Sequence, residues 1–171
     1  VSCQEVHRAI RATPNRKAPG ISGLKAELIK AAGWAAAECY TDLFRACLRC
    51  GAIPTAWKCA RLVPIPKVAG TSRIDEHRPI SLTEVPRKIF EKVLMRQLLA
   101  VVEPLDISQG GFRAKRSVLD QIASLNELLV QRCRAAAPPL VTFLDIKAAY
   151  DSVDRRILWN KLIEKGAPMP L

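Results

Sequence analysis

The chain has 171 residues, of which 49% are hydrophobic and 25% are charged, a composition typical of a globular domain. No uninterrupted apolar run approaches the length of about 18 residues that a membrane span needs, so the sequence predicts no such span. The formal net charge of +11 favours a polyanionic partner such as nucleic acid, with a well-solvated basic surface as the alternative. Because the chain begins with Val1 and shows no signal or transit peptide, we expect it to be a piece of a longer protein.

The N-terminal quarter is predicted to be helical around one loop. Ser2 and Glu5 have the spacing of a capping box, which predicts a short helix over residues 2–10. The stretch PNRKAPGISG (14–23) is rich in proline, glycine and charge and is predicted to be a loop. Ser22 is the predicted cap of a helix that follows to residue 50, broken at Gly33 and stopped by Gly51.

Six cysteines are present, and only Cys47 and Cys50, in the stretch CLRC, lie close together. A zinc site usually needs two such pairs, or one pair with two histidines, and His7 and His77 are isolated. We therefore assign the pair to one helix face, with a zinc-stapled interaction module as the alternative. Without a secretory signal, the cysteines are expected to be reduced thiols in the cytosol or nucleus.

The middle of the chain predicts a hairpin followed by a helix. WKCARLVPIPK (57–67) alternates prolines with apolar residues, as edge strands do, and HRPISL (77–82) is its predicted partner. EVPRKIFEKVLMRQLLAVVEPL (84–105) has helical periodicity. On another face of that helix, basic residues recur every four positions at Lys88, Lys92 and Arg96.

The last third predicts a basic loop, two helices and one strand. SQGGFRAKRS (108–117) is the glycine-rich basic loop, and Ser117 with Asp120 begins a helix that is ended by AAAPPL (135–140). LVTFLDI (140–146) is predicted to be a buried strand, and SVDRRILWNKLIEKG (152–166) a final helix. The pattern as a whole predicts an α+β fold that is mostly helical, with one hairpin and one buried strand.

Asp145 stands at the end of that predicted strand, where a side chain faces a crevice at the edge of a sheet. Carboxylate oxygens are ligands that Mg²⁺ prefers, and metal-assisted phosphoryl transfer uses carboxylates to hold two ions. The alternative is that Asp145 caps a strand-to-helix turn. Asp151 and Asp154 are explained equally well as acids near a helix N-terminus, where they are favoured.

The segment FLDIKAAYDSVDRRILWNKL (143–162) resembles the first catalytic motif of reverse transcriptases of non-LTR (LINE-type) retrotransposons. Four upstream segments resemble that family in the same order: RKAPGISGLKAELIK (16–30), WKCARLVPIPK (57–67), HRPISLTEVPRKIFEKVL (77–94) and SQGGFRAKRSVLDQI (108–122). The resemblance covers nearly the whole chain. Ser22 stands where the family usually has an acid, Gly110 stands where an aromatic residue is common, and no ADD motif occurs in the 171 residues.

The resemblance implies roles for residues near the first motif. Asp145 matches the metal-binding catalytic aspartate, and the backbone carbonyl of Ile146 is an implied second ligand for two Mg²⁺ ions. Tyr150 matches the aromatic residue that packs beneath the incoming sugar and excludes a 2′-OH; its alternative is an ordinary half-buried aromatic.

Basic residues on the upstream segments have implied roles as well. Arg78, Lys67 and Arg61 resemble cations that hold the triphosphate of the nucleotide, Arg78 most closely through RPISL. Lys67 and Arg61 are alternatively surface charges of an edge strand. Four further cations are implied contacts of the template backbone: Arg113, Lys115, Arg16 and Lys17. For the last two, a solvated loop is the alternative.

The implied fold is part of a right-hand polymerase, with fingers and supporting helices in residues 1–139 and the start of the palm in residues 140–171. The implied partners are an RNA template, a DNA primer or target, deoxynucleoside triphosphates and the remainder of the polymerase chain, in the nucleus or cytoplasm, with the nucleus favoured. With no ADD motif, we expect these residues to be inactive by themselves. The alternative function is a non-catalytic RNA-binding scaffold on the same fold.

Overall fold

The computed structural model describes residues 1–102, 106–135 and 138–167 of the chain. It divides into two compact units, Val1–Val101 and Val102–Ala167. Each unit is described by itself, and the predicted division into fingers and palm stays a prediction.

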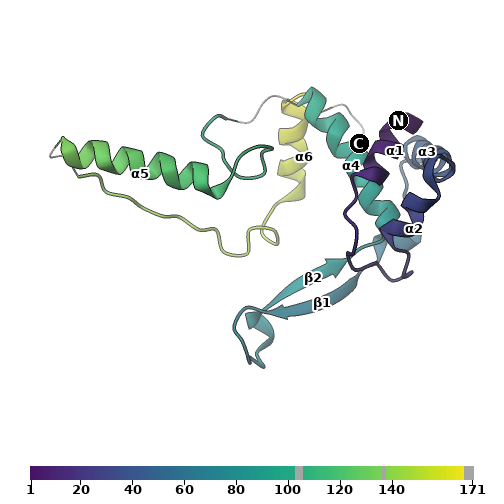
Figure 1. Ribbon diagram of the computed structural model, residues 1–171, viewed down its shortest axis with the longest axis horizontal. Coiled ribbons are helices and arrows are strands. Elements are labelled where there is room, and N and C mark those ends of the chain that lie inside the picture. The colour runs from purple at the N-terminus through teal and green to yellow at the C-terminus, as the bar shows by residue number, and fades with distance from the viewer. Residues whose placement is uncertain (103–105, 136–137, 168–171) are drawn as a thin grey trace. The chain divides into compact units, whose positions relative to one another are not determined.

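Four helices form the body of the first unit (Figure 1). They are α1 (Cys3–Arg11), α2 (Ala26–Ala31), α3 (Gly33–Cys50) and α4 (Val85–Val101). α1 packs against the other three. Residues 103–105, to which the predicted helix of residues 84–105 extended, lie outside the described residues.

Local sequence signals set several of these helix ends. The predicted capping box at the start of α1 is confirmed, since Glu5 N–H donates to Ser2 Oγ and Ser2 N–H donates to the Glu5 carboxylate. Gly51 ends α3 with a left-handed φ of 60°, as predicted. The predicted cap at Ser22 is wrong, because α2 begins after Lys25 and the Ser22 hydroxyl donates instead to Glu84 at the start of α4.

Aromatic side chains form the centre of the first unit's core. Phe44 of α3 lies with its ring centroid 4.9 Å from Phe90 of α4 and 6.0 Å from Trp57, which a short 3-10 helix, η1 (Thr55–Lys58), carries. Val6 and Ile10 of α1 are buried in the same cluster. Arg87 Nη1 donates to the Trp57 carbonyl at 2.8 Å and so joins η1 to α4.

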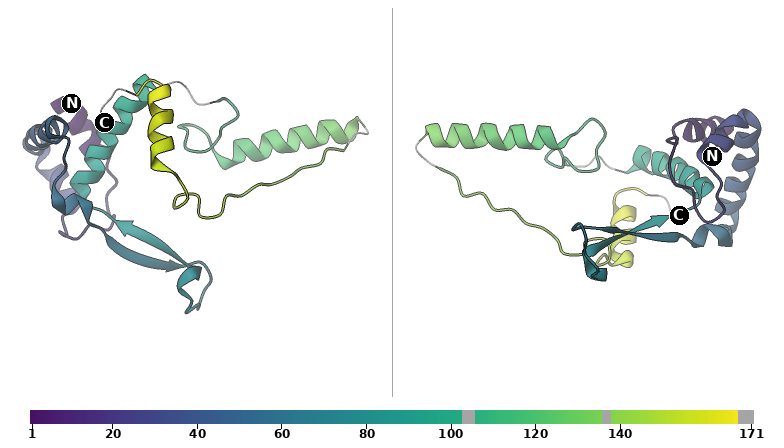
Figure 2. Two further views of the ribbon diagram at one scale, coloured as in Figure 1. Left: turned by 180° about the vertical axis from the view of Figure 1, so that it is seen from behind. Right: turned by 60° about the horizontal axis from the view of Figure 1, so that its bottom comes forward.

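The predicted hairpin is confirmed. β1 (Arg61–Pro66) pairs antiparallel with β2 (His77–Leu82), from Arg61 opposite Leu82 to Pro66 opposite His77. The loop between the strands contains a 3-10 turn, η2 (Ile74–Glu76). The hairpin of β1 and β2 extends away from the helices of its unit. None of these helices covers either face of the hairpin in any of the views (Figures 1 and 2).

The second unit contains α5 (Val118–Arg134) and α6 (Arg155–Glu164), and residues 138–154 before α6 form no helix or strand. The predicted capping box of Ser117 and Asp120 begins α5, and Asp154 caps α6 by accepting from Arg156 N–H. Neither helix has a buried residue. Their apolar side chains are largely exposed, which distinguishes this unit from the first.

The predicted strand at residues 140–146 is wrong for the structure described here. These residues have no strand hydrogen bonding, and Leu140 and Leu144 are 95% and 92% exposed. A strand exists only where a neighbour offers backbone donors and acceptors, and β1 with β2 makes the one sheet among the described residues. The α+β assignment therefore rests on the helices and the hairpin alone.

The six cysteines are free thiols. Cys47 and Cys50 lie on α3 as predicted, Cys47 in the core and Cys50 exposed at the helix end. Among the described parts of the chain, no helix combines the length and the apolar character that crossing a membrane requires.

Candidate functional site

The segment that carries Asp145 is an exposed, extended piece of chain followed by a tight turn. Asp145, Ile146 and Tyr150 are all exposed, Tyr150 to 84%. The turn is closed by two hydrogen bonds at 3.0 Å, from Asp151 N–H and Ser152 N–H to the Ala148 carbonyl. Tyr150 is therefore not the half-buried aromatic of the alternative reading.

The three aspartates of this stretch have different surroundings. Asp154 is a helix cap, since its carboxylate accepts from the backbone N–H of Arg156 at 2.8 Å. Asp151 lies in the turn and not in the helix, which begins at Arg155. Within the described residues, the Asp145 carboxylate makes no hydrogen bond or ion pair, so no structural partner accounts for this acid.

The metal-ligand chemistry is present only in part. The Asp145 carboxylate and the Ile146 carbonyl are hard oxygen donors of the kind that Mg²⁺ takes, and Mg²⁺ sites often combine one or two carboxylates with water and substrate phosphates. In the described ranges, no three or more His, Cys, Asp or Glu side chains gather where an ion could be held. Asp145 and Ile146 could therefore supply one carboxylate ligand and one carbonyl ligand of a magnesium site.

The hairpin brings two predicted cations to one face and places the third at the end of a strand. Side chains alternate along a strand, so Arg61 shares a face with Ile65, and Arg78 joins them because it pairs opposite Ile65. At about 3.3 Å per residue, Arg61 lies roughly 13 Å along the strands from Arg78. Lys67 is the first residue after β1, and its backbone N–H donates to the Glu76 carbonyl at 2.7 Å.

Near the loop that joins the two strands, basic side chains are already bonded to Asp75. Lys67 Nζ donates to the Asp75 carbonyl at 2.9 Å, and Arg73 forms an ion pair with the Asp75 carboxylate at 2.9 Å. Hydrogen bonds from Arg73 lower the pKa of Asp75. Arg78 and Arg61 have no such partner among the described residues and are exposed, so both are available to an anionic ligand, whereas Lys67 and Arg73 are engaged.

A buried carboxylate anchors the predicted template loop, and sequence reasoning missed it. Glu84 is 5% exposed and accepts from Ser22 N–H at 2.9 Å and from the Ser22 hydroxyl. These hydrogen bonds lower the pKa of Glu84. A Cβ at Gly20 would lie 2.7 Å from Glu84 Oε1, so the close approach requires glycine.

The contact explains the departure at position 22. An acid there would place a second carboxylate against Glu84 in a buried site, where like charges are costly. A serine supplies donors instead. The one sequence signal for Glu84 was an acid directly before a predicted helix, and that signal does not reveal a partner 62 residues away.

The four predicted template cations differ in whether their side chains are already hydrogen-bonded. Arg16 and Lys17 are exposed, and Arg16 N–H donates to the Glu27 carboxylate, which fixes the backbone but leaves the guanidinium outside the bond. Arg113 Nη1 donates to the Asp106 carbonyl at 2.8 Å and so closes its own loop. Lys115 is exposed, with a left-handed φ of 60°.

Residues 65–170 match the family model described as reverse transcriptase (RNA-dependent DNA polymerase). The chain is 29% identical over 95% of its length to the 115 kDa protein of the type-1 retrotransposable element R1DM of Drosophila melanogaster, and 29% identical over 90% to the RNA-directed DNA polymerase of the mobile element jockey of the same species. It is 27% identical over 78% to the Pol polyprotein of the type-1 retrotransposable element R2 of Nasonia vitripennis.

The chain spans only a small part of these relatives, 16%, 17% and 13% of their respective lengths. The matched range begins in β1 and contains β2, α4, α5 and the Asp145 segment. The similarity therefore includes Arg78 and Asp145 within a single matched range.

Proposed function

The chain belongs to the reverse transcriptase family and is homologous to the RNA-directed DNA polymerases of non-LTR retrotransposons, and on this premise we propose that it forms the nucleotide-binding hairpin and the first catalytic segment of such a polymerase. The family expected from the sequence is thereby confirmed. One observation carries the proposal: a single family match spans both Arg78 of the hairpin and Asp145.

The proposed reaction is RNA-templated addition of a deoxynucleotide. The 3′-oxygen of the primer forms a bond to the α-phosphorus of the deoxynucleotide. The bond from the α-phosphorus to the oxygen that bridges to the β-phosphate breaks, and pyrophosphate leaves. Asp145 and the Ile146 carbonyl would hold Mg²⁺, whose contribution in such transfers is to stabilise the attacking and leaving oxygens. The exposed carboxylate without a structural partner supports this role for Asp145.

The hairpin is proposed to hold the triphosphate. Arg78 pairs opposite Ile65, and Lys67 follows Ile65 by two residues, directly after the end of β1, so the two cations lie close along the hairpin. Fixed cations stabilise phosphoryl groups in transfer. Arg61 is on the same face as Arg78 and further away, so its contact is with another part of the ligand or with the template. Tyr150, exposed on the turn after Asp145, is proposed to pack under the sugar and exclude a 2′-OH.

Template contacts are proposed for the exposed Arg16, Lys17 and Lys115, which would hold backbone phosphates without reading the bases. Arg113 is proposed to act mainly by closing its loop, because its guanidinium is bonded to the Asp106 carbonyl.

The test uses a chimeric enzyme, the carrier polymerase, in which this chain replaces the aligned segment of the jockey polymerase. A second carrier polymerase receives only residues 65–170 of this chain, in case the longer exchange misfolds. We expect incorporation of labelled deoxynucleotide that depends on template RNA and primer. Carriers that are soluble and bind RNA but add no nucleotide would contradict the proposal and favour the non-catalytic RNA-binding scaffold.

A further inference from the structure

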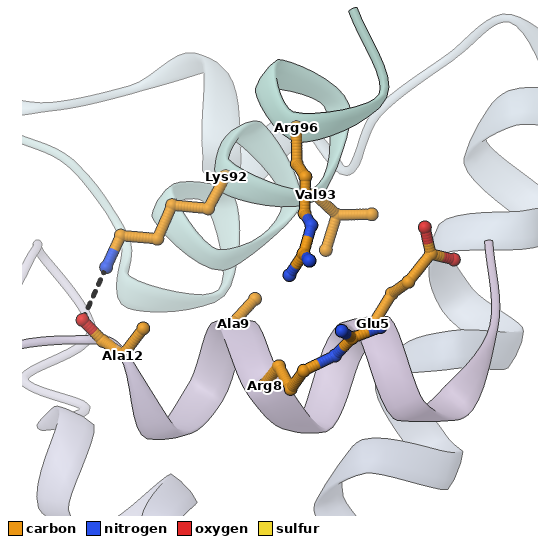
Figure 3. Close-up of a pocket in the computed structure, with 7 residues that line it drawn as sticks. All are labelled: Glu5, Arg8, Ala9, Ala12, Lys92, Val93 and Arg96. Carbon is orange, nitrogen blue, oxygen red and sulfur yellow. Dashed lines mark hydrogen bonds between the residues drawn. The ribbon is translucent and has the colours of Figure 1, made fainter. Parts of the chain in front are cut away.

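A basic pocket lies between α1 and α4 in the first unit, and its lining includes none of the residues assigned above to the nucleotide or the template. It has a volume of about 240 Å³. Figure 3 shows the residues that line it: Glu5, Arg8, Ala9, Ala12, Lys92, Val93 and Arg96. Three of the seven are cations and one is an acid, so the pocket carries a net positive charge.

The one acid of the pocket is already engaged. One Glu5 carboxylate oxygen accepts from Ser2 N–H at 2.7 Å, and the other accepts from Gln97 Nε2 at 3.3 Å. No ion pair joins Glu5 to Arg8 or Arg96 within the described chain. Glu5 therefore offsets only one of the three positive charges, and neither arginine has an ion-pair partner among the described residues.

Lys92 has a structural role and adds to the positive potential. Its Nζ donates to the Ala12 carbonyl at 3.0 Å and lies 3.4 Å from Thr13 Oγ1, at the C-terminal end of α1 (Figure 3). Cations are favoured at this end of a helix. Burial, and then the nearby charge of Lys30, lower the pKa of Lys92.

The two arginines are the groups available to a ligand. The Arg96 guanidinium points from α4 toward α1 above Ala9, and it makes no hydrogen bond or ion pair among the described residues (Figure 3). Arg8 uses only Nε, which donates to the Gln4 carbonyl at 3.4 Å, so its terminal nitrogens stay available. Guanidinium groups match phosphate with paired donors, and Ala9 and Val93 provide an apolar floor.

We propose that Arg8 and Arg96 bind a backbone phosphate of single-stranded RNA in this pocket. The inference rests on the proposed function, which brings an RNA strand to this chain, and it adds a contact that lies outside the residues assigned above. A phosphate contact positions a strand without reading its bases. Binding through the pocket is therefore independent of sequence and dependent on salt.

The test measures binding of the 171-residue chain to a labelled single-stranded RNA of about 16 nucleotides, by fluorescence anisotropy over a range of salt concentrations. The variants are Arg8→Gln, Arg96→Gln and the double variant. The matched control is Arg49→Gln, an exposed arginine in the last turn of α3. Far-UV circular dichroism and the unfolding midpoint check that each variant folds, and Arg96→Lys, which keeps the charge, should retain part of the binding.

The double variant is expected to weaken binding about tenfold or more, because two charge-assisted contacts are lost. It should reduce the salt slope by about 0.7, as the loss of one neutralised phosphate of a single strand predicts. Arg49→Gln should bind like the wild type. Equal affinity and salt slope for wild type and double variant would overturn the proposal. Unlabelled dATP added to the same anisotropy assay separates the two sources of phosphate. Competition by dATP that is seen with the wild type and lost in the double variant would mean that the pocket takes free nucleotides, and would overturn the assignment to the RNA backbone.

The two proposals fail separately. If the carrier polymerase is active and RNA binding does not depend on Arg8 and Arg96, the proposed phosphate site is contradicted and the proposed function is still supported. RNA binding that needs both arginines, together with an inactive carrier polymerase, supports the pocket and contradicts the polymerase.

Discussion

Glu84 is a buried carboxylate without a cation among its hydrogen-bond partners, and Ser22 supplies its donors. Burial disfavours the charged form, yet hydrogen bonds from the Ser22 hydroxyl and N–H outweigh it and lower the pKa. The carboxylate thereby fixes residues 20–22 against the start of α4. At the scale of single residues, this contact is what holds the loop that carries Arg16 and Lys17.

Replacing Glu84 tests that anchor. Glu84→Gln should lower the free energy of unfolding by about 1–3 kcal/mol at neutral pH, because a neutral amide loses the charge that strengthens both hydrogen bonds and can accept only one of them. Glu91→Gln is the matched control, since Glu91 lies on α4 in a partly exposed ion pair with Arg87, and it should cost less than about 1 kcal/mol. Urea unfolding followed by circular dichroism measures both, and equal losses would contradict the anchor.

The same group predicts a pH dependence. The pKa of Glu84 is lower in the folded than in the unfolded chain, so its contribution is fully present above the unfolded value and is lost as pH falls through the folded value. The free energy of unfolding of the wild type should therefore fall more steeply than that of Glu84→Gln as the solution is acidified below the ordinary glutamate range. Parallel curves for the two proteins would show that Glu84 does not titrate in this way.

Gly20 tests the geometry of the anchor from the other side. Gly20→Ala places a Cβ 2.7 Å from Glu84 Oε1 and 2.8 Å from its backbone nitrogen, so the loop or α4 must shift. We expect a loss of about 1–3 kcal/mol. Gly111→Ala, where an added Cβ meets nothing within 4 Å, is the control and should leave the unfolding midpoint nearly unchanged. A tolerated Gly20→Ala would mean that the approach is looser than described.

At the scale of elements, the hairpin predicts how a nucleotide is held. Arg78→Gln in the carrier polymerase should raise KM for deoxynucleoside triphosphate by about tenfold or more, because a charge-assisted contact to phosphate is lost. Arg73→Gln, on the same hairpin but engaged with Asp75 and Glu76, is the control and should leave KM unchanged. Steady-state incorporation kinetics measure both, and the reverse order would place the triphosphate elsewhere.

The helices of the two units differ in what stabilises them. α4 buries Val85, Ile89, Phe90 and Val93, whereas α5 has no buried residue and depends on its cap and backbone hydrogen bonds. An isolated helix of this length is marginal in water. Hydrogen exchange should therefore show amides of α5 exchanging orders of magnitude faster than those of the buried part of α4. Similar protection in both helices would contradict this account.

For the molecule as a whole, predictions from local pattern succeeded and those that needed a distant partner did not. The capping boxes at Ser2 and Ser117 depend on contacts three residues apart, and both are present. The cap expected at Ser22 failed because Glu84, 62 residues away, takes its hydroxyl. The strand expected at 140–146 failed because a strand needs a neighbour, which hydrophobic pattern does not provide.

The candidate site followed the same rule. The cations Arg61, Lys67 and Arg78 could be selected from the sequence, but only the strand register places Arg61 and Arg78 on one face. The basic spacing of Lys92 and Arg96 on α4 was visible, whereas their pairing with Arg8 of α1 required the packing of two helices. Family resemblance singled out Asp145, because its exposed surroundings alone do not distinguish it from Asp151.

We propose Asp145 as the catalytic metal ligand, and the most direct measurement compares the activity of an Asp145 variant with that of an Asp151 variant. Asp145→Asn and Asp151→Asn would be assayed side by side in the carrier polymerase for RNA-templated incorporation of deoxynucleotide in Mg²⁺. Loss of a metal ligand removes several kcal/mol of transition-state stabilisation, so Asp145→Asn should reduce kcat by about 100-fold or more, with RNA binding intact. Asp151→Asn should stay within a few-fold of the parent; equal activity of the two variants would contradict the claim.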